Sequence, residues 1–109
     1  MTDQEKANLD MYRLGHEQRV EDFARMRGAG VTFVCGSDSA WANYKMGAFQ
    51  DEMGTHVDGG MSPMEAIVSA TSDSARSCWI NDTVGSIAPD KIADLLVVDG
   101  DPSQDIAAT

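Results

Sequence analysis

The chain has 109 residues, which is enough for one small domain or for part of a larger one. Its net charge of −10 and its scattered Lys and Arg residues exclude a nucleic-acid-binding surface, and no apolar run approaches the ~20 residues of a membrane span. The first thirty residues are charged and polar and carry no secretory signal, so we expect a cytoplasmic protein.

The first predicted element is a helix over residues 4–27. Apolar and aromatic positions recur there at intervals of three and four residues, which places them on one face. Thr2 or Asp3 can cap its start, and Gly28 and Gly30 supply a stop.

Residues 31–35, Val-Thr-Phe-Val-Cys, predict a strand buried on both faces, as in a parallel sheet. The strand runs directly into Gly36, Ser37 and Asp38. A carboxylate at this point is where α/β barrels place catalytic groups, and it could bind a metal and take a proton from water. The same Gly-Ser-Asp-Ser sequence also fits a turn in which Asp38 accepts hydrogen bonds from its own backbone, and spacing alone leaves both readings open.

The second half of the chain predicts helices over residues 48–57, from Ser62 onward, and over residues 72–80. Ser62, Pro63 and Glu65 form a capping-box pattern, and Gly59-Gly60 ends the preceding helix. Ala75, Cys78 and Trp79 are expected to face inwards. A second strand is predicted over residues 93–99, after a turn at Pro89-Asp90. Two or three strands cannot complete a sheet around residues 31–35, so we expect neighbouring strands from outside this sequence.

The histidines, cysteines and serines of the chain form no known catalytic or metal-binding motif. His16 and His56 stand forty residues apart without a His-x-His or His-Glu-x-x-His spacing, and we expect them to be packing or surface residues. Cys35 and Cys78 form no Cys-x-x-Cys pair and are interpreted as small buried hydrophobic residues. The serines include no Gly-x-Ser-x-Gly elbow.

Three linked stretches resemble the amidohydrolase superfamily. Residues 29–38, Ala-Gly-Val-Thr-Phe-Val-Cys-Gly-Ser-Asp, are similar to the last barrel strand of that family. Residues 60–71 resemble the helix that follows, and residues 84–102 resemble the return into a small β-sandwich. The resemblance covers residues 17–106, and the closest branch is that of imidazolonepropionase-like and Xaa-Pro-dipeptidase-like enzymes.

The resemblance implies an α/β fold, a partial (β/α)8 TIM barrel over residues 1–80 that runs into part of a β-sandwich over residues 81–109. It implies a hydrolase of carbon–nitrogen bonds that acts on a small amide, cyclic amide or dipeptide with the help of a divalent metal, zinc being the expected one. Asp38 matches the aspartate that binds the metal, activates the attacking water and passes its proton to the leaving group.

The departures from the family limit this interpretation. The family's His-x-His pair, its bridging lysine or glutamate and its two later histidines have no counterpart in this sequence, and neither His16 nor His56 matches them. We therefore expect a fragment that is inactive alone and that associates as a homo-oligomer. The alternative is a non-catalytic α/β module that binds itself or a partner protein through its unpaired strands.

Overall fold

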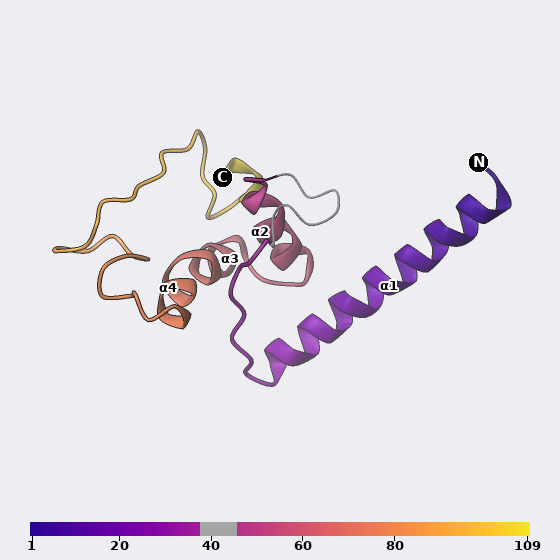
Figure 1. The fold of residues 1–109 in the computed structure, drawn as a ribbon, viewed down its shortest axis with the longest axis horizontal. Helices are drawn as coiled ribbons and strands as arrows, with labels where there is room; N and C mark the ends of the chain where they lie inside the picture. Colours follow the sequence, from indigo (N-terminus) through magenta and orange to yellow (C-terminus); the bar gives the residue numbers. More distant parts are fainter. Residues whose placement is uncertain (38–45) are drawn as a thin grey trace. The chain divides into compact units, whose positions relative to one another are not determined.

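The computed structural model describes residues 1–37 and 46–109 (Figure 1). These residues divide into two compact units, residues 1–31 and residues 32–109. Among them, no helix has the length and apolar character needed to cross a bilayer.

The first unit consists of helix α1, Asp3–Gly28, which confirms the predicted helix. Thr2 caps its start: the Thr2 side chain accepts from the Glu5 backbone N–H, and the Glu5 carboxylate accepts from the Thr2 N–H. At the other end Gly30 adopts a φ of 85°, and the Val31 N–H donates to the Met26 carbonyl, which is a Schellman cap. None of the residues of α1 is buried, so the predicted apolar stripe forms no core within this unit.

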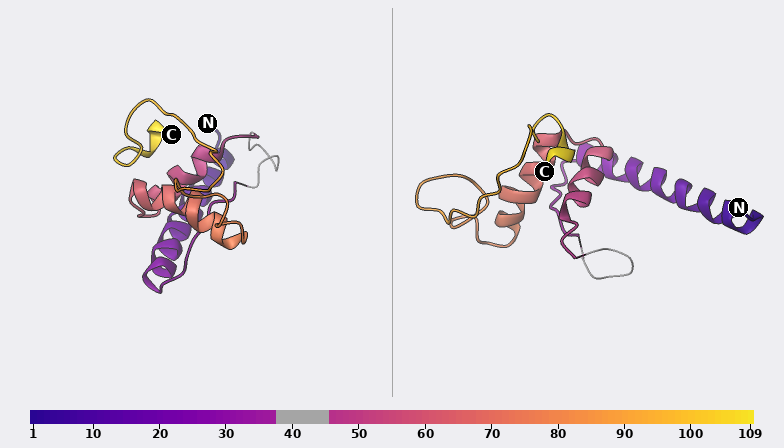
Figure 2. Two further views of the ribbon diagram at one scale, coloured as in Figure 1. Left: turned by 90° about the vertical axis from the view of Figure 1, so that its left-hand side faces the viewer. Right: turned by 90° about the horizontal axis from the view of Figure 1, so that it is seen from above.

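The second unit contains the helices α2 (Phe49–Asp58), α3 (Pro63–Val68) and α4 (Ser74–Ser77), with a π-helical turn η1 (Ser69–Asp73) between the last two (Figure 2). A short 3-10 turn η2 (Ile106–Ala108) ends the chain. The capping box predicted at the start of α3 is present, since the Ser62 hydroxyl accepts from the Glu65 N–H and the Glu65 carboxylate accepts from the Ser62 N–H. Among the described residues, the buried apolar side chains are those of Met53, Met61, Ala66 and Ala75.

The predicted strands are wrong. Neither residues 31–35 nor residues 93–99 form a β-strand, and the described part of the chain contains no sheet. The expected α/β class, with a partial barrel running into a β-sandwich, is therefore not seen. A helix makes its backbone hydrogen bonds within its own segment, whereas a strand needs a second strand beside it. The described residues provide no such partner.

The chain after α4 runs instead as a wide loop (Figures 1 and 2). The apolar side chains of Ile87 and Val97 are 91% and 93% exposed. A cavity of about 620 Å³ lies between this loop and the helices, and its lining includes Phe49, Met53 and Leu95. The loop therefore contributes little to a packed interior.

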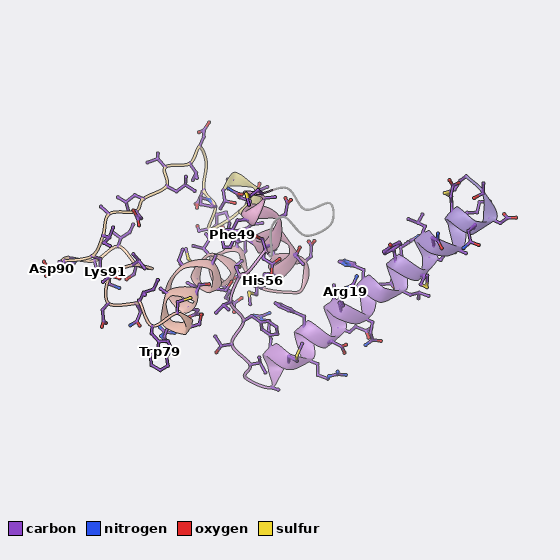
Figure 3. The ribbon with its side chains drawn as sticks, in the orientation of Figure 1. Arg19, Phe49, His56, Trp79, Asp90 and Lys91 are labelled. Atoms are coloured by element: carbon purple, nitrogen blue, oxygen red, sulfur yellow. The ribbon has the colours of Figure 1, made fainter. Side chains whose placement is uncertain are left out.

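The end of α4 also differs from expectation. Ala75 is buried as predicted, but Cys78 is exposed and the Trp79 side chain is 92% exposed, so the inward orientation predicted for both is wrong (Figure 3). Trp79 adopts a φ of 61°, and the Ile80 N–H donates to the Ala75 carbonyl. This is the Schellman geometry again, with tryptophan in the left-handed position that glycine usually occupies.

Candidate functional site

The residue predicted to be catalytic, Asp38, lies outside the described residues. The structure describes the chain up to Ser37 and again from Met46. The metal-binding and proton-transfer roles of Asp38 therefore stay predictions.

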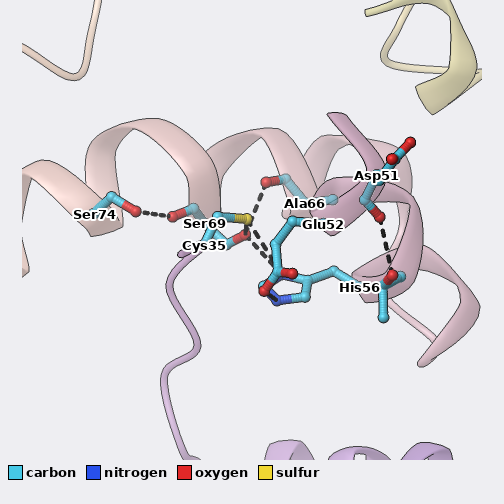
Figure 4. A network of polar contacts seen from close by, with 8 residues as sticks. Cys35, Asp51, Glu52, His56, Ala66, Ser69 and Ser74 are labelled. Carbon is cyan, nitrogen blue, oxygen red and sulfur yellow. Dashed lines mark hydrogen bonds and ion pairs between the residues drawn. The ribbon is translucent and has the colours of Figure 1, made fainter. Parts of the chain in front are cut away.

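Three residues before Asp38, the Cys35 side chain enters a polar cluster with His56 and Ser69 (Figure 4). The Cys35 Sγ atom lies 3.6 Å from His56 Nδ1 and 3.4 Å from Ser69 Oγ, and His56 Nδ1 lies 3.1 Å from Ser69 Oγ. His56 is 5% exposed and Ser69 is 2% exposed, while Cys35 is half-buried. The cluster thus joins three segments that are far apart in the sequence.

Local structure places the two buried members of the cluster. His56 lies in the last turn of α2, which ends in a Schellman cap: Gly60 has a φ of 98°, and the Met61 N–H donates to the His56 carbonyl. The reversal at these glycines lets α3 pack against α2. Ser69 opens the π-helical turn η1, where its carbonyl accepts from the Ser74 hydroxyl at 2.7 Å. Its own hydroxyl donates to the Ala66 carbonyl at 2.8 Å.

Glu52 supplies the negative charge near this cluster. It lies one turn before His56 on α2, with Glu52 Oε1 3.6 Å from His56 Nε2. Burial lowers the pKa of His56, and the Glu52 charge opposes that shift without cancelling it. Burial raises the pKa of the Cys35 thiol, the hydrogen bond with Ser69 lowers it, and the Glu52 charge raises it further. At neutral pH the cluster therefore holds a neutral imidazole beside a protonated thiol, which is a poor nucleophile.

The remaining candidates from the sequence are not brought into this cluster. His16 lies exposed on α1. Ser62 caps α3, and the Ser77 hydroxyl donates to the Ser74 carbonyl, so both have structural roles. His56 is a packing residue, as expected, but its pairing with Cys35 and Ser69 was not foreseen, because no sequence motif links positions separated by 21 and 13 residues.

The described residues do not fit the divalent metal that the family resemblance implies. Within residues 1–37 and 46–109, no three His, Cys, Asp or Glu side chains gather in a group that could hold a metal ion. A hydrolytic zinc site needs three such ligands as a rule. No catalytic step through a metal can therefore be built on these residues.

Comparison with known proteins gives one positive result. The family model described as "Amidohydrolase family" matches residues 2–109, which is almost the entire chain. Among curated proteins, none matches the chain.

Proposed function

Because the chain belongs to the amidohydrolase family, we propose that it forms part of a hydrolase that cleaves carbon–nitrogen bonds. The substrate class is a small amide, a cyclic amide or a dipeptide, as in the imidazolonepropionase-like and Xaa-Pro-dipeptidase-like branch. The family match over residues 2–109 is the observation that supports this proposal.

Asp38 is the residue of this chain proposed to act in the reaction. An aspartate carboxylate is ordinarily ionised at neutral pH and can accept a proton. In the proposed step Asp38 takes a proton from the water that attacks the carbonyl carbon. It then delivers that proton to the nitrogen as the carbon–nitrogen bond breaks. The run Gly36-Ser37-Asp38 within the matched family region supports this assignment.

The divalent metal proposed for this reaction, with zinc as the expected ion, would need ligands other than those the structure describes. Bound zinc would polarise the carbonyl and its attacking water. We propose that these ligands come from further sequence or from another chain. Two apolar segments support an incomplete site: residues 31–35 contain Val31 and Val34 with exposed side chains, and residues 92–97 contain Leu95, Leu96 and Val97 with exposed side chains.

The same exposed segments favour a second candidate, a non-catalytic module that associates with itself. Contiguous exposed apolar surface commonly marks an interaction site, and extended apolar segments can pair edge to edge. In this case the protein would form a homo-oligomer and show no turnover.

One experiment separates the two functions. The protein is purified from its native source without chelator, so that any further sequence or partner is kept, and its mass in solution is measured by light scattering. The same sample is assayed against amides, cyclic amides and dipeptides with zinc present. Turnover that is lost in Asp38→Asn and kept in Asp82→Asn, an exposed aspartate, supports the hydrolase. A stable oligomer without turnover of any substrate would contradict it and support the module.

A further inference from the structure

We propose that residues 92–98 pair with the same residues of a second copy of the chain, as an antiparallel two-stranded ladder. The pairing rests on the self-association given above as the second candidate function, and it assigns a surface and a register to that association. It holds whether or not Asp38 acts in catalysis. The segment follows Asp90 and Lys91 in the wide loop of the second unit (Figure 3).

The backbone of this segment has hydrogen-bonding groups to offer. Residues 92–98 form no helix or turn. Among the described residues, the only backbone hydrogen bond that involves them runs from the Ile92 N–H to the Thr83 carbonyl at 2.8 Å. Pro89 and Pro102, which have no N–H, lie outside the segment, so every residue within it has a donor. A row of unpaired N–H and C=O groups is a template for another strand.

The side chains of the same segment are apolar and exposed. Leu95, Leu96 and Val97 are 62%, 74% and 93% exposed, and pairing would remove part of this surface from water. Natural edge strands are commonly protected from association by lysine or proline, and residues 92–98 contain neither. Asp94 is the only charged residue among them. The segment therefore lacks the usual barriers to pairing.

Charge complementarity selects a second copy as the partner and sets the register. When Leu95 lies on the two-fold axis of an antiparallel pair, Lys91 of each copy stands opposite Asp99 of the other. An ion pair then lies at each end of the ladder. Moving the axis to either side of Leu95, between it and a neighbouring residue, places Asp90 opposite Asp99 or Asp101 instead, where like charges repel.

The Lys91 ammonium is positioned for this ion pair. It donates to the Asn81 carbonyl at 2.6 Å and to the Ser86 hydroxyl at 2.7 Å, which hold it beside the start of the segment. Both are neutral groups, and no carboxylate of the described residues forms an ion pair with Lys91. Its positive charge is therefore available to Asp99 of the second copy.

The hydrogen bond that Ile92 already makes determines which backbone groups face the second copy. In an antiparallel pair, every second residue exchanges both N–H···O bonds with the residue opposite, and the residues between point their N–H groups away. The Ile92 N–H is occupied within its own chain, so Ile92 belongs to the residues that point away. The residues that bond to the second copy are then Ala93, Leu95 and Val97, while the Leu96 N–H stays in solvent.

Amide hydrogen exchange of the wild-type chain tests this alternation without any substitution. Exchange is followed residue by residue by NMR at rising protein concentration, and light scattering gives the mass of the same samples. We expect the mass to change from that of a monomer to that of a dimer. Over the same range, exchange at Ala93, Leu95 and Val97 should slow at least about tenfold, and exchange at Asp94 and Leu96 should change little.

Two matched pairs of variants test the same register. Leu95→Pro removes an N–H that faces the second copy, whereas Leu96→Pro makes the same change at an N–H that points away. We expect the dissociation constant of the dimer to be at least about tenfold higher in Leu95→Pro than in Leu96→Pro. Asp99→Lys should also weaken the dimer, and Asp82→Lys, at an exposed aspartate outside the segment, should not. Circular dichroism establishes that the helices are retained.

The outcomes separate this pairing from the functions on which it bears. A chain that stays monomeric at every concentration would overturn both the self-association and the pairing. An oligomer with uniform exchange over residues 92–98, or with equal effects of the two proline substitutions, would overturn the pairing and leave self-association through another surface. None of these results changes the proposal of a hydrolase, which is tested by turnover.

Discussion

Replacement of Gly85 by alanine is the substitution whose cost the structure defines best. Gly85 has a φ of 89°, a conformation that costs residues with a Cβ about 1–2 kcal/mol. A Cβ at this position would also lie 2.5 Å from the Ala75 Cβ and 3.0 Å from the Thr71 carbonyl oxygen. Ala75 is buried, so the overlap must be relieved by movement of the backbone, at a further cost of about 1–3 kcal/mol. We expect Gly85→Ala to lower the free energy of unfolding by about 2–5 kcal/mol.

Urea unfolding followed by far-UV circular dichroism measures this loss. The matched control is Gly54→Ala: Gly54 lies within α2, and a Cβ there meets nothing within 4 Å. Alanine in an open helical position gains about 1 kcal/mol relative to glycine, so the control should be slightly more stable than the wild type. If Gly85→Ala were as stable as the wild type, the packing of residues 84–86 against Ala75 and η1 would be wrong.

Three further predictions concern stability. Trp79→Gly should raise the free energy of unfolding by about 0.5–1 kcal/mol, because glycine adopts the left-handed backbone without strain and the 92% exposed tryptophan side chain buries almost no surface. If urea unfolding gave a lower free energy of unfolding for this variant, the indole would have to pack against the protein. Ser62→Ala should lower the free energy of unfolding by about 1 kcal/mol, because the capping box of α3 is lost. Thermal unfolding of this variant is compared with that of Ser77→Ala, and equal losses of stability in the two variants would contradict the prediction. The free energy of unfolding should also fall as the pH drops below 6.5. Burial lowers the pKa of His56 in the folded chain, so the unfolded chain binds the proton at a higher pH than the folded chain does. His56→Gln should remove part of this pH dependence, whereas His16→Gln should not.

The helices could be predicted from the sequence because their signals are local. The Thr2 and Ser62 capping boxes and the glycines after α1 and α2 lie within a few residues of the hydrogen bonds they make. The helix predicted over residues 4–27 differs by one residue at each end from the observed Asp3–Gly28. Each of these elements depends on contacts between near neighbours in the chain.

The strands could not be predicted in the same way. Residues 31–35 and 93–99 have the apolar, β-branched composition of strands, but a strand exists only where a second one pairs with it. The described residues contain no partner, and the segments stay irregular. The expectation that Cys78 and Trp79 face inwards was wrong for a different reason: the left-handed backbone at Trp79 turns the chain away at that point.

The site was predictable only where a motif is contiguous. Gly36-Ser37-Asp38 is a short run that the family resemblance could identify, and the family match includes it. The cluster of Cys35, His56 and Ser69 depends instead on how α2 and α3 reverse at Gly60 and on the π-helical turn that begins at Ser69. No sequence pattern predicts a π-helical turn at this position.

The proposed role of Asp38 as the base of a carbon–nitrogen hydrolase can be tested by comparing kcat for the wild type, Asp38→Asn and Asp82→Asn. The three proteins are purified in the assembled, zinc-supplied form, and circular dichroism establishes that all are equally folded. We expect Asp38→Asn to lower kcat by at least about 100-fold, the range of a lost general base, and Asp82→Asn to retain wild-type turnover. A wild-type kcat in Asp38→Asn would show that Asp38 is not the base.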